Sequence, residues 1–320
     1  MSVKEVLPGI FMIKVPLPGS PLKSLNSYVI MAKRPLIIDT GFNMDECYVE
    51  LVKALNEIGV DYKRADYFIT HLHADHLGLA GRLTSTVYIS EGDAIIMQEP
   101  SSAQRILRYL SFFTMNGFPL EDLDKVLRSH PAVRYYSEVN FQVVKDGELF
   151  EYGDYKLKAI LTPGHTPGHM CLYDEDNGVL FSGDHILFDI TPNVPYWEGH
   201  DSLWEYLNSL DKIYSLDVKH VLPGHREFHG DVKKRILELK EHHERRLDEV
   251  VNALKSGAKT AWQVAPEISW DLTYDQWDAI NPIQKWFIIS ETIAHLIYLE
   301  NRGIVKEEIR DDRIYYMLAK

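Results

Sequence analysis

The sequence predicts a layered α/β domain followed by a smaller, mostly helical one. Between residues 6 and 228, short apolar runs of β type alternate with helical stretches, an element order typical of layered α/β proteins. Several of these runs end in a Gly-containing turn with a His or Asp at its tip. After residue 228 the pattern changes to long stretches of helical spacing and a final hairpin. We therefore predict domains at 1–228 and 229–320.

Composition and charge limit the classes of protein to consider. The chain has 320 residues, of which 45% are hydrophobic and 25% charged, as in ordinary globular proteins. No run approaches the ~18 apolar residues that a membrane-spanning helix needs. The first five residues lack the basic patch and apolar run of a secretory signal, so we expect a cytoplasmic protein without a membrane partner. Two cysteines, Cys47 and Cys171, are too few for a disulfide framework, and we expect both to be buried apolar residues.

The net charge of −13 is unevenly distributed. Residues 229–320 carry 14 Lys and Arg against 16 Asp and Glu, so the first 228 residues carry 20 against 31. Binding to a phosphate backbone relies on Lys and Arg, which displace counterions. The charge therefore disfavours nucleic acid as a partner, although a local basic patch would escape this count, and favours a small-molecule substrate.

The N-terminal region reads as strands and one helix. Apolar runs predict strands at 9–13, 27–31, 35–39 and 60–70, and the spacing of 45–58 predicts a helix. Another strand is expected at 86–90. These elements lead into the first motif that carries chemistry.

Residues 70–78 read T-H-L-H-A-D-H-L-G, which places four candidate metal ligands within six residues. Strand alternation predicts His71 and His73 on one side, whereas Asp75 and His76 fall where the chain turns into a helix. This suits two adjacent metal ions, and imidazole with carboxylate but no thiolate favours zinc or another borderline divalent ion. The alternative is a loop that is rich in histidine by chance. Asp39, at the end of the 35–39 strand, is either a turn residue or a carboxylate that steadies a metal ligand.

Residues 92–140 predict two or three short helices inserted in the α/β frame. They contribute apolar and aromatic surface, which serves as extra core, as a homodimer contact, or as a lid over the metal site. The sequence leaves all three alternatives open.

In the second half of the first domain, several predicted strands end in a similar turn that contains glycine and a His or Asp. Strands are expected at 141–144, 149–152 and 155–161, and the last runs into T-P-G-H-T-P-G-H at 162–169. Two later strands end in S-G-D-H at 182–185 and L-P-G-H at 222–225. Such turns at successive strand ends can gather ligands from distant parts of the sequence at one sheet edge.

The C-terminal region predicts helices at 232–254, 260–268 and 282–301, followed by a β-hairpin at 304–318. Helices followed by a hairpin suggest a small winged-helix-like module. Its net charge of −2 favours a packing or dimerisation role over nucleic-acid binding.

With these motifs in their order, the chain resembles the metallo-β-lactamase superfamily from about residue 6 to 228. The resemblance implies a four-layer αββα sandwich with a dinuclear metal site at one edge of two sheets. It implies that His71, His73 and His165 hold one metal, that Asp75, His76 and His225 hold the other, and that Asp184 bridges them. Asp39 matches the first motif of the family, and His169 fits a supporting role. Seven further histidines match no ligand position: His185, His200, His220, His229, His242, His243 and His295.

Two divalent metals would lower the pKa of a bound water toward about 7 and stabilise an oxyanion. Asp75 is the predicted catalytic residue, because it could orient this water and accept its proton. We expect a hydrolase of small esters, thioesters or lactones, with zinc as the metal and iron or manganese as alternatives.

The substrate is less well defined. The apolar segment 188–197 predicts a pocket wall with Phe188, Tyr196 and Trp197, or else a buried loop. It holds no Lys or Arg, which disfavours glutathione thioesters. The alternatives are an RNA nuclease or phosphodiesterase, suggested by the C-terminal module, a mononuclear-iron persulfide dioxygenase, which shares much of the motif set, and a non-catalytic protein that retains the fold.

Overall fold

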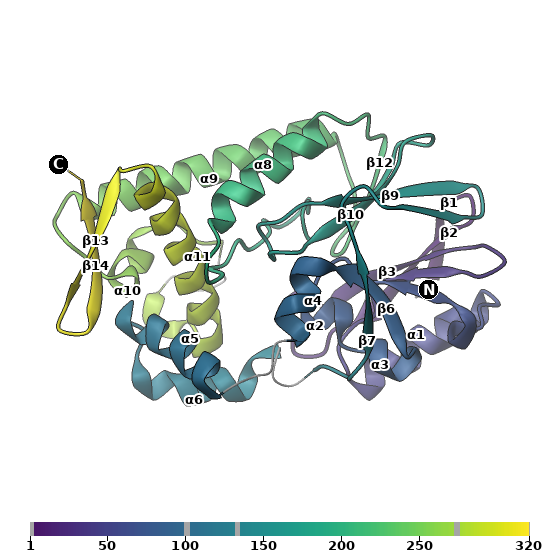
Figure 1. Cartoon of the computed structure of the whole chain (residues 1–320), viewed down its shortest axis with the longest axis horizontal. Coiled ribbons are helices and arrows are strands. Elements are labelled where there is room, and N and C mark those ends of the chain that lie inside the picture. The colour runs from purple at the N-terminus through teal and green to yellow at the C-terminus, as the bar shows by residue number, and fades with distance from the viewer. Residues whose placement is uncertain (1–2, 99–102, 132–134, 272–275, 320) are drawn as a thin grey trace. The chain divides into compact units, whose positions relative to one another are not determined.

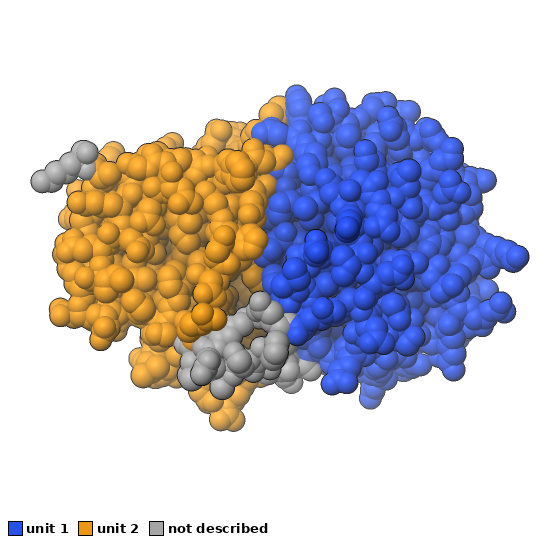
Figure 2. All heavy atoms as spheres, in the orientation of Figure 1, with its two compact units in different colours: residues 1–98, 131–192, 209–236 blue, residues 99–130, 193–208, 237–320 orange. Residues whose placement is uncertain are grey.

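The structure is a computed structural model that describes residues 3–98, 103–131, 135–271 and 276–319. The chain forms two compact units (Figures 1 and 2), one of residues 1–98, 131–192 and 209–236, the other of 99–130, 193–208 and 237–320. None of the described helices is both long and apolar enough to cross a lipid bilayer.

The first unit is built on two β-sheets. The seven-stranded sheet follows chain order: β1 (Val3–Leu7), β2 (Ile10–Pro16), β3 (Ser24–Ile30), β4 (Leu36–Ile38), β5 (Asp66–Phe68), β6 (Thr86–Ser90) and β7 (Asn140–Val144). The five-stranded sheet has the order β12 (His220–Pro223), β11 (Val179–Gly183), β10 (Met170–Asp174), β9 (Tyr155–Leu161) and β8 (Leu149–Tyr152). Strands β4 to β7 are parallel, so each link between them has to cross back over the sheet.

Alternation along the strands creates a core on each face of the larger sheet. Val29 and Ile37 pack in one core with Leu51 of α1 (Asp45–Glu57). Their neighbours in sequence face the smaller sheet, where the rings of Tyr28 and Phe181 meet edge to face at 5.5 Å. The two sheets therefore form a sandwich, as period-2 patterning requires.

A helix covers the outer side of the smaller sheet as well. In α8 (Ser202–Tyr214), Ser209 Oγ donates to Pro163 O at 2.9 Å, and Lys212 Nζ donates to Leu161 O at 2.7 Å. The order helix, sheet, sheet, helix confirms the predicted αββα class. Shorter helices complete this unit: η1 (Tyr62–Arg64), α2 (Ala74–Leu77), α3 (Ala80–Leu83) and α4 (Glu91–Gln98).

The second unit is mainly helical. Its elements are α5 (Ala103–Met115), α6 (Leu120–Ser129), most of α9 (Val232–Leu254), α10 (Ala261–Val264), η2 (Ala265–Glu267), η3 (Trp277–Ala279), α11 (Pro282–Asn301) and the hairpin of β13 (Val305–Arg310) and β14 (Arg313–Leu318). In its core, the ring of Phe113 from α5 stacks on Trp286 from α11 at 3.7 Å. Of the roles considered for residues 92–140, extra core therefore describes α5 and α6, while a lid and a dimer contact stay predictions.

Most predicted elements are confirmed within one to three residues, including the helix at 232–254 and the hairpin. The strand expected at 60–70 is wrong in length, because Asp61 caps a 3-10 turn and β5 covers only Asp66–Phe68. Helix α8 was not predicted, although the buried residues Leu203, Tyr206, Leu210 and Ile213 show helical spacing. Both cysteines are free and buried, as expected. The division into domains 1–228 and 229–320 and the winged-helix-like character stay predictions.

Candidate metal centre

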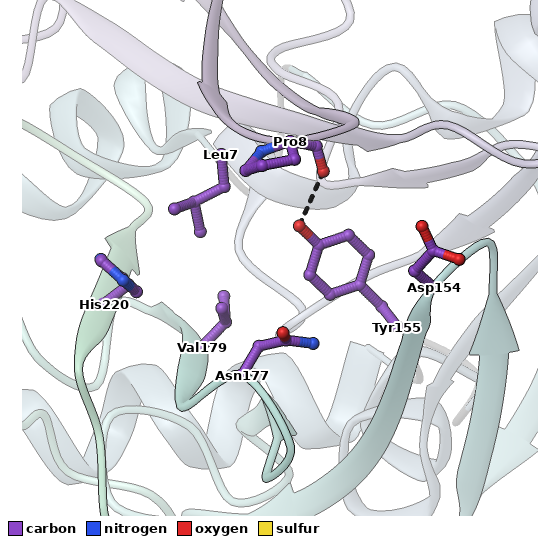
Figure 3. Close-up of a pocket in the computed structure, with 7 residues that line it drawn as sticks. All are labelled: Leu7, Pro8, Asp154, Tyr155, Asn177, Val179 and His220. Atoms are coloured by element: carbon purple, nitrogen blue, oxygen red, sulfur yellow. Dashed lines mark hydrogen bonds between the residues drawn. The ribbon is translucent and has the colours of Figure 1, made fainter.

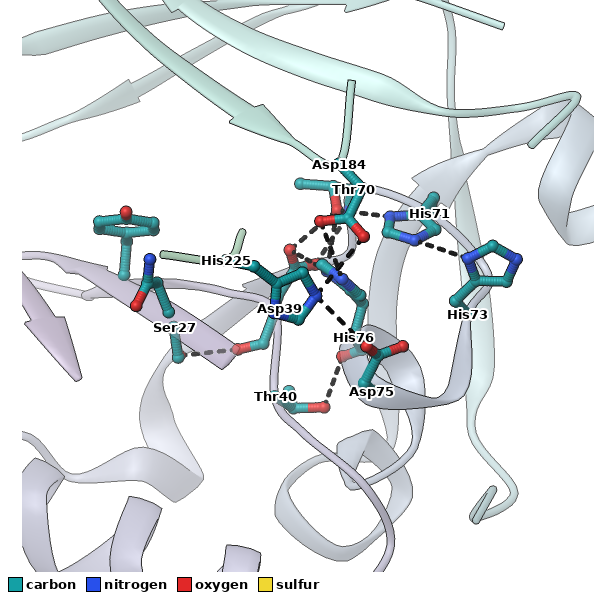
Figure 4. Close-up of polar contacts among 12 residues, drawn as sticks. Ser27, Asp39, Thr40, Thr70, His71, His73, Asp75, His76, Asp184 and His225 are labelled. Carbon is teal, nitrogen blue, oxygen red and sulfur yellow. Dashed lines mark hydrogen bonds and ion pairs between the residues drawn. The ribbon is translucent and has the colours of Figure 1, made fainter. Parts of the chain in front are cut away.

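The predicted ligands converge at one edge of the sandwich because each follows the end of a strand. Figure 4 shows all of them except His165. The 70–76 turn follows β5 and enters α2, and His165 lies in the loop after β9. Asp184 and His225 follow the parallel strands β11 and β12, whose carboxyl ends lie side by side. The structure therefore brings together all seven residues that the sequence marked as metal ligands.

His71, His73 and His165 form a three-histidine group. His73 Nδ1 lies 3.1 Å from His71 Nε2 and 2.9 Å from His165 Nε2. Around a tetrahedral zinc with bonds of 2.0–2.1 Å, neighbouring nitrogens lie about 3.3 Å apart. The nitrogens of this group thus face one shared point at nearly the spacing that a cation requires.

Asp75, His76 and His225 form the second group, with Asp75 Oδ2 3.3 Å from His225 Nε2. The Asp184 carboxylate lies between the two groups. Its oxygens are 3.5 Å from the Nε2 atoms of both His76 and His225, and 3.7 Å from His165 Nε2. Asp184 is therefore placed to contact cations held by either group.

The prediction that strand alternation aligns His71 and His73 is wrong, because β5 ends at Phe68. Instead, Asp39 ends the ladder: its Oδ1 accepts the Thr70 N–H at 2.8 Å. The residues after Thr70 then form an irregular turn that leads into α2. The two rings converge through this turn and not through pleating.

Asp39 also fixes the tautomers of two histidines. Its Oδ2 accepts from His76 Nδ1 at 2.7 Å and from Thr70 Oγ1 at 2.8 Å. Because the Thr70 hydroxyl donates to Asp39, it can only accept from His71 Nδ1, 3.0 Å away. Both imidazoles thereby carry a proton on Nδ1, which leaves Nε2 as the nitrogen that would bind a metal. Thr70 was not among the predicted site residues, although it directly precedes the first histidine.

His225 is oriented in the same manner, since its Nδ1 donates to Ser24 O at 2.8 Å. As a result, His76 Nε2, His225 Nε2 and Asp184 Oδ1 are buried atoms that make no hydrogen bond within the described part of the chain. Leaving such atoms unpaired is costly, and a bound cation would satisfy all three. The residues fit a metal centre.

His169 supports the site and is not a ligand. Its Nε2 accepts the Asp184 N–H at 3.1 Å, while Nδ1 lies 2.8 Å from Thr162 Oγ1, so the Nε2 lone pair is already used.

The backbone at Gly224 passes close to the Asp184 carboxylate. A Cβ on Gly224 would lie 2.6 Å from Asp184 Oδ1. This position therefore requires glycine.

The electrostatics favour positive charge beside Asp184. Burial, and after it the neighbouring His165, lowers the pKa of His73 to about 3. For His225, burial lowers the pKa too, but Asp184 and Asp75 outweigh it and raise the pKa to about 10. Burial raises the pKa of Asp75, yet the His225 imidazole 3.3 Å away and the charge of His76 bring it to about 2. Asp75 is therefore ionised at neutral pH and attracts cations.

The residues predicted to line a pocket fall in different units. Phe188 belongs to the first unit, where its ring meets Phe228 at 5.0 Å. Tyr196 and Trp197 belong to the second, where Tyr196 stacks on Phe112 at 4.5 Å. The pocket wall at 188–197 therefore stays a prediction.

Arg235, which was not predicted as a site residue, reaches the 188–197 segment from α9. Its Nε donates to Leu187 O at 2.7 Å and its Nη2 to Ile190 O at 3.0 Å. The guanidinium thus holds the backbone at residues 187–190.

A separate cavity of about 290 Å³ lies at the other end of the smaller sheet (Figure 3). Its lining includes Tyr155, Val179 and His220, which are the first residues of β9, β11 and β12. The ligands follow the last residues of those strands. This cavity is therefore not part of the metal centre.

A second histidine group lies in the helical unit, formed by His242, His243 and Glu291. Glu291 already pairs with the buried guanidinium of Arg246, which neutralises its charge. His243 Nδ1 lies 3.2 Å from His295 Nε2. We interpret this group as a buried polar network of the core.

Comparisons with known proteins point to one family. A family model described as "Metallo-beta-lactamase superfamily" matches residues 22–225, more than half of the chain. The chain is 24% identical over 328 residues to "Probable metallo-hydrolase YqjP" of Bacillus subtilis, covering 96% of this chain and 97% of that protein. It is 25% identical over 236 residues to "Beta-lactamase-like protein 2 homolog" of Caenorhabditis elegans, covering 73% of this chain and 66% of that protein.

Two further matches bear on fold and chemistry. A metallo-beta-lactamase family protein of Thermus thermophilus superposes with a TM-score of 0.83 and 30% identity, covering 98% of this chain and 100% of that chain. "Atrochrysone carboxyl ACP thioesterase" of Aspergillus fumigatus is 30% identical over 131 residues, covering 41% of this chain and 40% of that protein. The chain belongs to the metallo-beta-lactamase superfamily and is a metallo-hydrolase of that superfamily.

Proposed function

We propose that the protein is a dinuclear zinc hydrolase that cleaves small acyl compounds, with thioesters as the first choice among thioesters, esters and lactones. The observation that carries this proposal is the position of Asp184. Its carboxylate lies 3.5–3.7 Å from imidazole nitrogens of both groups, and its Oδ1 is buried without a hydrogen bond to any described residue. Such a carboxylate is suited to share two cations.

His71, His73 and His165 would hold one zinc, and Asp75, His76 and His225 the other. When bound, the metals would supply a water of lowered pKa and positive charge for a developing oxyanion. The ligand set contributes two negative charges against four positive ones, so the centre keeps a net positive charge for a polarised carbonyl.

Asp75 is the proposed catalytic residue. It is ionised at neutral pH, lies 3.3 Å from His225, and is about nine-tenths buried. A buried, ionised carboxylate at this point can orient an attacking water and accept its proton. The proton would then pass to the leaving group. A thiolate leaving group depends less on this proton than an alkoxide does.

Support for thioesters comes from the fungal relative, which is named as a thioesterase, although the match covers less than half of either protein. The nuclease and iron dioxygenase alternatives gain no comparable support. A winged-helix-like module in the second unit is still our prediction, and its acidic charge favours packing over nucleic-acid binding.

The test is hydrolysis by zinc-reconstituted protein of matched N-acetylcysteamine thioesters, ethyl esters and lactones of the same acyl chains, beside Asp184→Asn. We expect thioesters to be cleaved fastest and the variant to lose most activity. The matched control is Asp174→Asn, since Asp174 is also a fully buried aspartate of the smaller sheet but contacts Lys156 and Asn177. Full activity in Asp184→Asn, or RNA cleavage without acyl hydrolysis, would overturn the proposal.

A further inference from the structure

Asp93 is a buried carboxylate that lies beside the metal centre and has no place in the ligand set. It sits in the first turn of α4, with no exposed surface. Its Oδ2 accepts the Leu72 N–H at 2.7 Å and the Thr166 hydroxyl at 2.9 Å, and its Oδ1 accepts the Gly168 N–H at 2.7 Å. One carboxylate therefore binds two segments that are about ninety residues apart in sequence.

Both segments carry the three-histidine group. Leu72 is the residue between His71 and His73, and Thr166 directly follows His165. The distance across the group, 2.9 Å between His73 Nδ1 and His165 Nε2, joins these same segments. The carboxylate of Asp93 thus joins the same two segments that a metal held by the three histidines would join.

The surrounding backbone leaves Asp93 little freedom. Its own N–H donates to Ser90 Oγ at 3.2 Å, which caps the start of α4. A Cβ on Gly168 would lie 2.1 Å from that same oxygen and 2.3 Å from the Asp93 nitrogen. The helix start and the histidine loop are therefore in direct contact through a glycine.

We propose that Asp93 is the positioning residue of the three-histidine group: by holding Leu72 on one side and Thr166 and Gly168 on the other, it sets the separation of His71 and His73 from His165. This inference rests on the proposed function only in that the group binds a metal ion. Asp39 has the complementary task, since it holds Thr70 and His76. Asp39 also reaches His71 through Thr70, so it supports both groups, whereas Asp93 would serve mainly the three-histidine group.

An asparagine cannot do the work of this aspartate. Its single oxygen could accept either from Leu72 and Thr166 or from Gly168, while its NH₂ group would point at the remaining N–H donor. Asp93→Asn keeps the size of the side chain but releases one of the two segments. A released loop must be reordered each time a metal binds, which lowers affinity.

Asp174→Asn is the matched control. Asp174 is equally buried and also accepts three hydrogen bonds, from Lys156 N–H and Asn177 N–H at 2.7 Å and from Asn177 Nδ2 at 3.0 Å. Its partners lie in hairpins at the strand ends away from the metal centre. If both variants lose stability, the cause is the change to a buried carboxylate. If only Asp93→Asn binds metal more weakly, the cause is the position of Asp93 beside the three-histidine group.

The experiment is titration of metal-free full-length protein with Co²⁺, followed by visible absorption and by competition with a chelator. We expect Asp93→Asn to bind one of two Co²⁺ equivalents at least about tenfold more weakly and with an altered absorption band, while Asp174→Asn binds both as the natural protein does. If Asp93→Asn does not fold, Thr166→Val replaces it, with an expected weakening of about threefold to tenfold for one lost hydrogen bond.

Cobalt binding by Asp93→Asn or Thr166→Val that matches Asp174→Asn in affinity and spectrum would overturn the inference. So would equal weakening of both equivalents, because a clamp on one group has to act unequally. The hydrolysis assay decides the proposed function separately. If the natural protein cleaves no acyl substrate but Asp93→Asn still weakens one cobalt equivalent, the proposed function fails and this inference stands.

Discussion

Replacing Asp39 by Asn is expected to weaken metal binding by the group of Asp75, His76 and His225, although none of the proposed ligands is itself replaced. Asp39 accepts from Thr70 N–H and Thr70 Oγ1 at 2.8 Å and from His76 Nδ1 at 2.7 Å. In the variant, the amide oxygen can stay on the Thr70 N–H, so the NH₂ group faces His76 Nδ1. His76 must then become the other tautomer in order to accept from it.

That change places the proton on His76 Nε2, the atom 3.5 Å from Asp184 Oδ1 that the metal requires. Loss of such a supporting partner costs about 10- to 100-fold in metal affinity, equivalent to about 1.4–2.8 kcal/mol. The metal-free variant should also lose about 1–1.5 kcal/mol of unfolding free energy, because a charged hydrogen bond is replaced by a neutral one.

The assay is zinc competition against a chromophoric chelator, with metal-free urea unfolding measured in parallel and Asp174→Asn as the control. Two zinc equivalents bound by Asp39→Asn with unchanged affinity would refute the tautomer argument. A loss of stability alone, equal to that of Asp174→Asn, would refute it as well.

Three further outcomes are expected. Gly224→Ala should abolish most activity and reduce zinc content, because its Cβ would lie 2.6 Å from Asp184 Oδ1; normal zinc content by elemental analysis would contradict this. Chelation should lower the midpoint of thermal unfolding, because zinc at 100 times its Kd stabilises the folded state by about 2.7 kcal/mol, and an unchanged midpoint would count against bound metal. Burial and the charge of Arg246 together lower the pKa of His295 to about 3, so the folded chain keeps the ring neutral. The unfolded chain takes up the proton below pH ~6.5, so urea unfolding should show stability falling from about pH 6.5 toward 3, by up to about 1.4 kcal/mol per pH unit, with a shallower fall in His295→Gln.

The candidate metal ligands could be selected from the sequence because they are concentrated in short motifs. Four of the seven lie within 71–76, and each of the others follows the end of a strand and stands directly after a glycine. Local spacing was a poor guide to how they meet, however. His71 and His73 converge although neither lies in a strand. Strand β5 ends at Phe68, and the Thr70 N–H donates to the Asp39 side chain and not to a neighbouring strand.

Features that depend on distant packing were missed. Asp93 reads as an ordinary acidic residue in a helix, and only the fold brings it to Leu72 and Gly168. The sequence also did not reveal which segments would pack together in each of the two units. Residues 99–130 follow the first sheet strands in sequence, yet Phe113 stacks on Trp286, far along the chain. Local patterns predict elements, but they do not predict which distant segments share a core.

Anomalous diffraction at the zinc absorption edge, from crystals of zinc-loaded protein, tests the central proposal most directly. It should show two peaks of comparable height, one on each side of the Asp184 carboxylate, with the three-histidine group around one and Asp75, His76 and His225 around the other. A single peak, or zinc bound elsewhere with this carboxylate unliganded, would contradict the dinuclear site.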